Sequence, residues 1–156
     1  MSKTYYIAYG SNLNIESMKV RCPDAKPVGK AVLPDYKLVY RGKWRDSFLT
    51  IEPAEGRPLP IGVWQISPRD EMMLDRYEGY PYFYYKKNML LPVVDCGDHV
   101  LRDVTALVYI INKEYEAAIP SADYMEECIQ GYRDFGFDPE LLHIALEETT
   151  RMVEDA

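Results

Sequence analysis

The segment Tyr6-Ile7-Ala8-Tyr9-Gly10-Ser11-Asn12-Leu13 decides how the N-terminal part of this chain folds. The aromatic and apolar residues from Thr4 to Tyr9 are typical of a β-strand, and the glycine, serine and asparagine that follow favour a sharp turn. Asn14 is suited to cap a short helix that runs to about Cys22. The segment therefore predicts a strand that enters a tight loop and leaves it as a helix.

A second helix start lies in the middle of the chain. Ser67-Pro68-Arg69-Asp70 combines a capping serine, a proline suited to the first helical position and the acid of a capping box. The helix should be short, because Gly79 and Pro81 are stop signals. We expect one side of this helix to be buried, through Met72, Met73 and Leu74.

The remaining pattern predicts strands before this helix and after it, followed by helices near the C-terminus. Ser121 is expected to cap a helix to about Phe135, and Asp138-Pro139 to start another. Extended chain is expected at residues 28–40, with an interruption at Pro34-Asp35, and strands at 48–51, 61–66, 82–94 and 101–111. A polar loop is expected at 41–45 and a hairpin loop at 95–98. This order favours an α+β fold, with a mixed or closed sheet flanked by helices.

Length and charge limit the classes of function. The chain has 156 residues, 47% of them hydrophobic, which suits a single domain over residues 1–156. Its net charge of −7 would repel a phosphate backbone, so no nucleic-acid partner is expected. Its apolar runs are too short to span a bilayer, and the first residues lack the apolar segment of a signal peptide. We therefore expect a cytoplasmic protein with no membrane partner.

Cysteine and histidine are sparse, and the carboxylates show no pattern of the kind that metal sites use. The three cysteines, Cys22, Cys96 and Cys128, are an odd number without short spacing, which favours reduced thiols over a disulfide framework or a zinc site. The only histidines are His99 and His143. We therefore predict no bound metal.

The Gly10-Ser11-Asn12 turn is the first candidate for chemistry. A turn between a strand and a helix leaves backbone N–H groups without partners, and such a nest can bind a carboxylate or an oxyanion. Glycine would allow a ligand to approach the backbone closely. From the residues alone, an ordinary polar turn explains the segment as well. Ser11 is a poor candidate for a nucleophile, because no histidine and acid can be singled out to activate it.

Glu78 is the second candidate, because it lies within an aromatic stretch, Tyr77-Glu78-Gly79-Tyr80-Pro81-Tyr82-Phe83-Tyr84-Tyr85. Aromatic neighbours exclude water, which raises the pKa of a glutamate toward the range that is useful for proton transfer. The alternative is a surface acid at a helix end, beside tyrosines that only pack. Tyr124 could project a phenol into a pocket or could simply pack in the core. Three arginines are possible carboxylate clamps, and the sequence does not choose among them: Arg21, Arg41 and Arg45.

Several blocks of the chain, in order, resemble the γ-glutamylcyclotransferase-like (AIG2-like) family. The first block is Tyr6 to Leu13, and the resemblance covers most of residues 4–137. The later blocks are Arg21-Cys22-Pro23-Asp24-Ala25, Gly62-Val63-Trp64, Leu74-Asp75-Arg76-Tyr77-Glu78-Gly79-Tyr80, and Pro120-Ser121 through Tyr124 to Gly131.

The resemblance implies a small mixed β-barrel flanked by helices, with a pocket where the loop after the first strand meets the glutamate. It also implies an enzyme that needs no cofactor and that cleaves γ-glutamyl amino acids or γ-glutamylamines by cyclisation, releasing 5-oxoproline and a free amine. Glu78 would be the catalytic acid/base. The residues implied to bind the γ-glutamyl group are Tyr9, Gly10, Ser11, Asn12 and Leu13, with Tyr84 and Tyr124 as further pocket residues.

Other functions remain open at this point. The same residues would serve an enzyme that removes a γ-glutamyl protecting group from a biosynthetic intermediate, or a binding module that only holds a γ-glutamyl ligand. A small-molecule partner is expected in each case. The sequence identifies neither the leaving amine nor the oligomeric state, for which monomer and homodimer both fit.

Overall fold

Strand β1 (Thr4–Ala8) lies inside a mixed sheet in the computed structural model, which describes residues 4–95, 100 and 103–156. Within those residues the sheet has six strands in the order β6-β8-β1-β5-β2-β7. Strand β1 pairs in parallel with β8 and antiparallel with β5. The other strands of this sheet are β2 (Lys26–Leu33), β5 (Leu59–Ile66), β6 (Tyr84–Leu91), β7 (Val94–Asp95) and β8 (Val104–Ile111).

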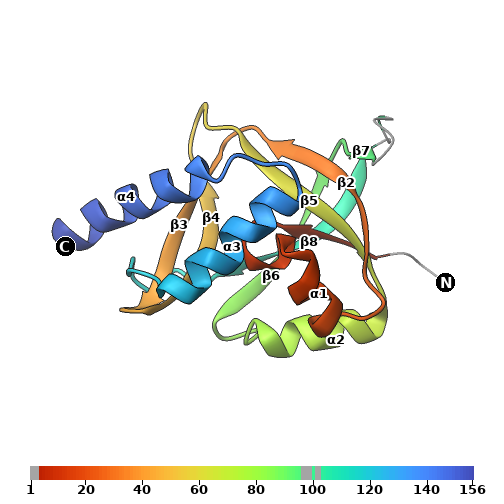
Figure 1. Cartoon of the computed structure of the whole chain (residues 1–156), viewed down its shortest axis with the longest axis horizontal. Coiled ribbons are helices and arrows are strands. Elements are labelled where there is room, and N and C mark those ends of the chain that lie inside the picture. Colours follow the sequence, from red (N-terminus) through yellow and green to blue (C-terminus); the bar gives the residue numbers. More distant parts are fainter. Residues whose placement is uncertain (1–3, 96–99, 101–102) are drawn as a thin grey trace.

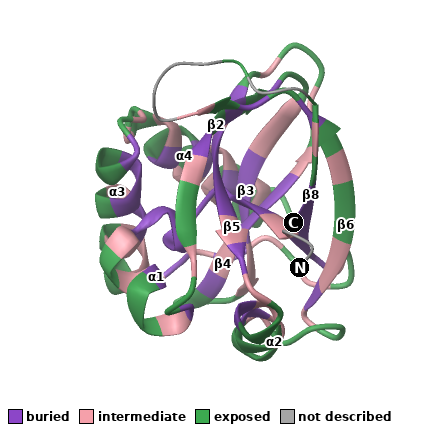
Figure 2. Cartoon of the chain, turned by 90° about the vertical axis from the view of Figure 1, so that its right-hand side faces the viewer, coloured by how far each residue is buried: buried purple, intermediate pink, exposed green. Residues whose placement is uncertain are grey.

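The sheet is strongly curved, because its two edge strands follow one another in the chain. Strand β6 ends at Leu91 and β7 begins at Val94, so only two residues join opposite edges of the sheet. Figure 2 shows the strands wrapping around a buried interior. No ladder joins β6 to β7 within the described residues, so the barrel is incomplete. The α+β fold, with a small mixed sheet flanked by helices, is confirmed.

A separate hairpin, β3 (Tyr36–Lys43) and β4 (Asp46–Pro53), packs beside this sheet. Its strand β4 contacts β8, where the Ile111 N–H donates a hydrogen bond of 2.9 Å to Thr50 Oγ1. The predicted polar loop at 41–45 is wrong in part, because Arg41 to Lys43 belong to β3. Only Trp44 and Arg45 form the turn, and Arg45 adopts the required positive φ of 59°.

The helices begin where the sequence predicts them. They are α1 (Ile15–Arg21), α2 (Pro68–Tyr77), α3 (Ala122–Asp134) and α4 (Glu140–Glu154), with a short 3₁₀ turn, η1 (Ser11–Leu13), before α1. The predicted caps are present: the side chains of Asn14, Ser67 and Ser121 each accept a hydrogen bond from a backbone N–H three residues on. Figure 1 shows α1 and α3 beside η1, α2 below the strands, and α4 against β3. No helix among the described residues is long and apolar enough to cross a membrane.

The buried face of α2 differs from the prediction. Leu74 is fully buried, but Met72 and Met73 are exposed by 61% and 42%. The helix turns about 100° per residue, so Asp70 and Leu74, four residues apart, share the inward face while the two methionines point away. The predicted hairpin loop at 95–98 lies mostly outside the described residues.

Candidate active site

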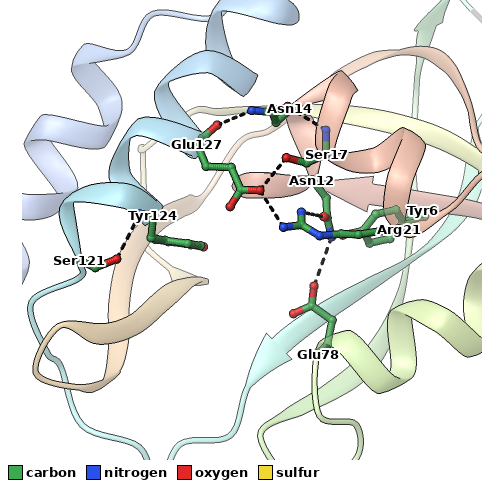
Figure 3. Close-up of polar contacts among 9 residues, drawn as sticks. All are labelled: Tyr6, Asn12, Asn14, Ser17, Arg21, Glu78, Ser121, Tyr124 and Glu127. Atoms are coloured by element: carbon green, nitrogen blue, oxygen red, sulfur yellow. Dashed lines mark hydrogen bonds and ion pairs between the residues drawn. The ribbon is translucent and has the colours of Figure 1, made fainter.

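A cavity of about 130 Å³ lies where the loop after β1 faces the end of α2. Most of the described residues that line it are aromatic, and six of them are tyrosines. Figure 3 shows some of its lining side chains, Tyr6, Asn12, Glu78 and Tyr124, together with neighbouring polar residues. The lining residues are Tyr6, Tyr9, Gly10, Ser11, Asn12, Phe48, Leu49, Tyr77, Glu78, Phe83, Tyr84, Tyr109 and Tyr124.

Glu78 is placed in this cavity by the end of α2. It is the C-cap residue, whose N–H donates a hydrogen bond of 2.8 Å to the Leu74 carbonyl. Gly79 follows with φ of +65°, a left-handed conformation that costs glycine little and lets the chain leave the helix at once. The Glu78 carboxylate points at the loop and accepts a hydrogen bond of 3.2 Å from Asn12 Nδ2 (Figure 3).

Burial raises the pKa of Glu78 from its ordinary value of 4.5 to about 8, against the lowering effects of the Arg21 charge and the Asn12 hydrogen bond. A pKa in this range lets the side chain both accept and return a proton near neutral pH. The aromatic surroundings thus have the effect on this carboxyl group that the sequence predicts.

The loop after β1 reaches the cavity with four of its five predicted residues. Tyr9 donates its hydroxyl proton to the Tyr109 carbonyl at 2.6 Å, which fixes the ring against β8. Gly10 lies so close to β4 that an added Cβ would meet Leu49 Cδ1 at 3.1 Å and the Tyr124 hydroxyl at 3.4 Å. Ser11 and Asn12 are buried in the cavity wall. In a helical turn of this kind, the first backbone N–H groups have no partner within the turn.

Leu13, the fifth predicted loop residue, does not line the cavity. Its side chain is fully buried in the hydrophobic core, close to Gly62 of β5. Its N–H donates to the Gly10 carbonyl at 3.0 Å. Leu13 therefore anchors and closes the turn, and only the four residues before it face the cavity.

Tyr84 and Tyr124, the two further predicted pocket residues, both reach the cavity and meet at Leu49 of β4. The Tyr84 hydroxyl donates to the Leu49 carbonyl at 2.8 Å, and the Leu49 N–H donates to the Tyr124 hydroxyl at 3.0 Å. From the aromatic stretch after Gly79, Phe83 and Tyr84 line the cavity, whereas Tyr80 and Tyr82 are exposed by 40% and 80%.

Several cavity residues are not singled out by the sequence. Tyr6 and Tyr109 lie on neighbouring strands with their rings 5.8 Å apart, and Phe48 comes from the separate hairpin. Strand alternation alone could place Tyr6 on the same face as Ala8. It could not predict the contact with Tyr109, which depends on the register that pairs Tyr6 with Leu107 of β8.

The three candidate arginines have different positions. Arg21 reaches the site, where its Nη1 donates to Asn12 Oδ1 at 2.8 Å and its Nη2 to Glu127 Oε2 at 2.7 Å (Figure 3). Arg41 forms an ion pair with Glu52 on the hairpin, and Arg45 stacks on Trp44 at the hairpin turn. Neither of these two lines the cavity.

Fold and site together define an α+β protein with a glutamate of raised pKa in a tyrosine-lined cavity. The chain belongs to the γ-glutamyl cyclotransferase, AIG2-like family, whose model matches residues 6–126. It is 30% identical over 139 residues to the γ-glutamylcyclotransferases of Bos taurus and of Homo sapiens, and each match covers 84% of this chain and 71% of the relative.

Solved structures show the same fold. A structure described as a γ-glutamyl cyclotransferase matches with a TM-score of 0.74 and 24% identity, over 97% of this chain and 88% of that one. A yeast γ-glutamyl cyclotransferase described as specific to glutathione matches with a TM-score of 0.61 and 11% identity, over 97% of both chains.

Proposed function

We propose that this protein is a γ-glutamylcyclotransferase that converts γ-glutamyl amino acids or γ-glutamylamines into 5-oxoproline and a free amine. The observation that carries the proposal is the carboxyl group of Glu78, which has a pKa of about 8, lines a small cavity and accepts a hydrogen bond from Asn12 of the Gly10–Asn12 turn. Membership of the family supports the same reaction.

The reaction needs a group that moves protons, because the substrate supplies its own nucleophile. The α-amine attacks the γ-carbonyl carbon, a C–N bond forms to close the five-membered ring, and the bond to the leaving amine breaks. The α-ammonium group must lose protons before and after the attack, and the leaving nitrogen must gain them. Glu78 as a carboxylate would accept a proton from the α-ammonium group and then return it to the leaving nitrogen.

The substrate itself would prepare Glu78 for this task. A positive α-ammonium group close to the carboxyl favours its ionised form, and therefore lowers the pKa below that of the empty site. The binding of the α-ammonium group and the ionisation of Glu78 are thus coupled. Tyrosine and phenylalanine rings keep water away, which strengthens this pairing.

The size of the cavity fits the smaller part of such a substrate. A volume of about 130 Å³ is well below that of a pocket for a drug-sized molecule, which is roughly 300–1,000 Å³. We therefore place the γ-glutamyl group inside and the leaving amine toward the opening. Backbone N–H groups of Ser11 and Asn12 would bind the α-carboxylate or the oxyanion that forms at the γ-carbonyl. Holding the γ-glutamyl arm in a folded shape can contribute roughly 7–11 kcal/mol to lowering the barrier.

A substrate panel tests the proposal and narrows the leaving group. The purified protein is incubated with γ-glutamyl amino acids, γ-glutamylamines and glutathione, and 5-oxoproline and the released amine are measured together by mass spectrometry. We expect one class to give the two products in equal amounts. Binding without products, across the whole panel, would contradict catalysis and favour a protein that only holds γ-glutamyl ligands.

A further inference from the structure

A chain of three polar side chains leads from the surface of α3 to the carboxylate of Glu78 (Figure 3). Glu127 of α3 accepts a hydrogen bond from Arg21 Nη2 at 2.7 Å, and Arg21 Nη1 donates to Asn12 Oδ1 at 2.8 Å. The Asn12 amide nitrogen then donates to Glu78 Oε1 at 3.2 Å. Arg21 and Glu127 are not among the residues that line the cavity.

Arg21 decides which way the Asn12 amide faces. A guanidinium group can only donate hydrogen bonds, so the oxygen of the amide must face Arg21. The NH₂ group is thereby directed to the other side, where it donates to Glu78 Oε1 and, at 2.8 Å, to the Tyr6 hydroxyl. The opposite orientation would place an amide oxygen against the carboxylate and an NH₂ group against the guanidinium.

Arg21 itself is held on two sides. Glu127 Oε2 also accepts a hydrogen bond of 2.6 Å from Ser17 Oγ, so this carboxylate is fixed to α1 as well as to α3. The guanidinium carbon lies 4.0 Å from the centre of the Tyr77 ring, a cation–π contact. Only 18% of the Arg21 side chain is exposed. The guanidinium group is thus held in a position from which it reaches both Asn12 and Glu127.

Arg21 is also the source of charge that acts on Glu78. The other titratable groups that interact with Glu78 are uncharged near neutral pH, because burial raises the pKa of every one of them. They come from the β1 strand and loop, the end of α1, α2, β6 and α3, and are Tyr6, Tyr9, Cys22, Tyr77, Tyr84 and Tyr124. Within the described part of the chain, Arg21 is the cation that favours the Glu78 carboxylate.

We propose that Arg21 is a positioning residue for Glu78: its guanidinium fixes the orientation of the Asn12 amide and supplies the positive charge that favours the carboxylate. The proposal rests on the proposed function, in which Glu78 carries protons. Orientation and charge are separate contributions, and different substitutions remove them separately.

The test compares Arg21→Met, which removes both contributions, with Arg21→Lys, which keeps the charge but loses the pair of Nη1 and Nη2 donors. Arg57→Met is the matched control, because Arg57 forms a similar ion pair with Glu148 away from the cavity. Two quantities are measured: the kcat and KM for release of 5-oxoproline, and the midpoint of the Glu78 titration, followed by NMR of ¹³C-labelled glutamate carboxyl groups.

We expect Arg21→Met to lower kcat about 10- to 100-fold, the range for losing a hydrogen bond to a charged group. KM should change less, because Arg21 does not line the cavity. The midpoint for Glu78 should move to higher pH. Arg21→Lys should bring the midpoint back toward that of the native protein while kcat stays reduced. Arg57→Met should resemble the native protein in both measurements.

A native midpoint in Arg21→Met, together with a kcat equal to that of Arg57→Met, would overturn the proposal. If Arg21→Met does not fold, Glu127→Gln replaces it: this variant keeps the Arg21 charge and loosens its anchor, so kcat should fall while the midpoint stays. An unchanged kcat there would count against positioning. If the native protein releases no 5-oxoproline, the proposed function fails, and the NMR midpoints of the arginine variants still decide whether Arg21 acts on Glu78.

Discussion

Replacing Glu78 by glutamine should change how the stability of the protein depends on pH. The pKa of Glu78 is about 8 in the folded protein, above its ordinary value of 4.5, and burial is the main cause. Between these two pH values the folded state binds more protons than the unfolded state, so the free energy of unfolding decreases as pH rises. Glutamine does not titrate and removes this decrease.

The size of the effect follows from the same two pKa values. At about 1.4 kcal/mol for each tenfold change in an equilibrium constant, a rise from 4.5 to about 8 corresponds to at most about 5 kcal/mol. Glu78 is not fully buried, so solvent should reduce this to about 2–4 kcal/mol. The stabilising contribution is fully present below pH 4.5 and is lost as pH rises through about 8.

Urea unfolding of both proteins at pH 5 and at pH 9 measures this difference. Other groups titrate in both proteins and cancel in the comparison. We expect the free energy of unfolding of the native protein to fall by about 2–4 kcal/mol more than that of Glu78→Gln between pH 5 and pH 9. If the two proteins lose stability in parallel over this range, the carboxyl group is not held in a water-poor site, and the argument for its raised pKa is refuted.

Three further outcomes are expected. The kcat/KM of the native protein should rise with pH, reach half of its limiting value near pH 8 and level off above that pH, as the Glu78 carboxylate of the free protein forms; a flat pH–rate profile would exclude that ionisation. Gly10→Val should raise KM, since Leu49 and the Tyr124 hydroxyl already occupy the space that the added Cβ needs. Isothermal titration with the product 5-oxoproline measures the affinity directly, and an unchanged affinity would contradict the prediction. Ser121→Ala should lower the free energy of unfolding by about 1 kcal/mol, because Ser121 caps the helix that carries Tyr124; thermal melts that coincide would contradict the cap.

The helix starts could be predicted because a cap is a local contact. Asn14, Ser67 and Ser121 each bond a backbone N–H three residues away, so the sequence holds all the information that the contact needs. The inward face of α2 could not be predicted from hydrophobicity alone. Met72 and Met73 are apolar but exposed, since the position of the helix against the sheet selects Asp70 and Leu74 instead.

The candidate site likewise has a part that could be predicted from the sequence and a part that could not. Glu78 and the Gly10–Asn12 turn have local features, a helix end among aromatic rings and a strand end with small polar residues. The remaining wall is set by long-range packing: Tyr109 arrives with β8, and Leu49 with a hairpin outside the main sheet. Arg21 shows most clearly what could not be predicted from the sequence. The sequence offers three arginines, and only the tertiary arrangement of α1, η1 and α3 brings this one to both Asn12 and Glu127.

Release of 5-oxoproline by native protein and by Glu78→Gln, with the most reactive γ-glutamyl compound as substrate, tests the central claim most directly. We predict that the native protein forms 5-oxoproline and that the variant, folded and able to bind the substrate, is slower by about 10²–10⁴, the range for one general acid/base. Equal rates in the two proteins would contradict the assignment of proton transfer to Glu78.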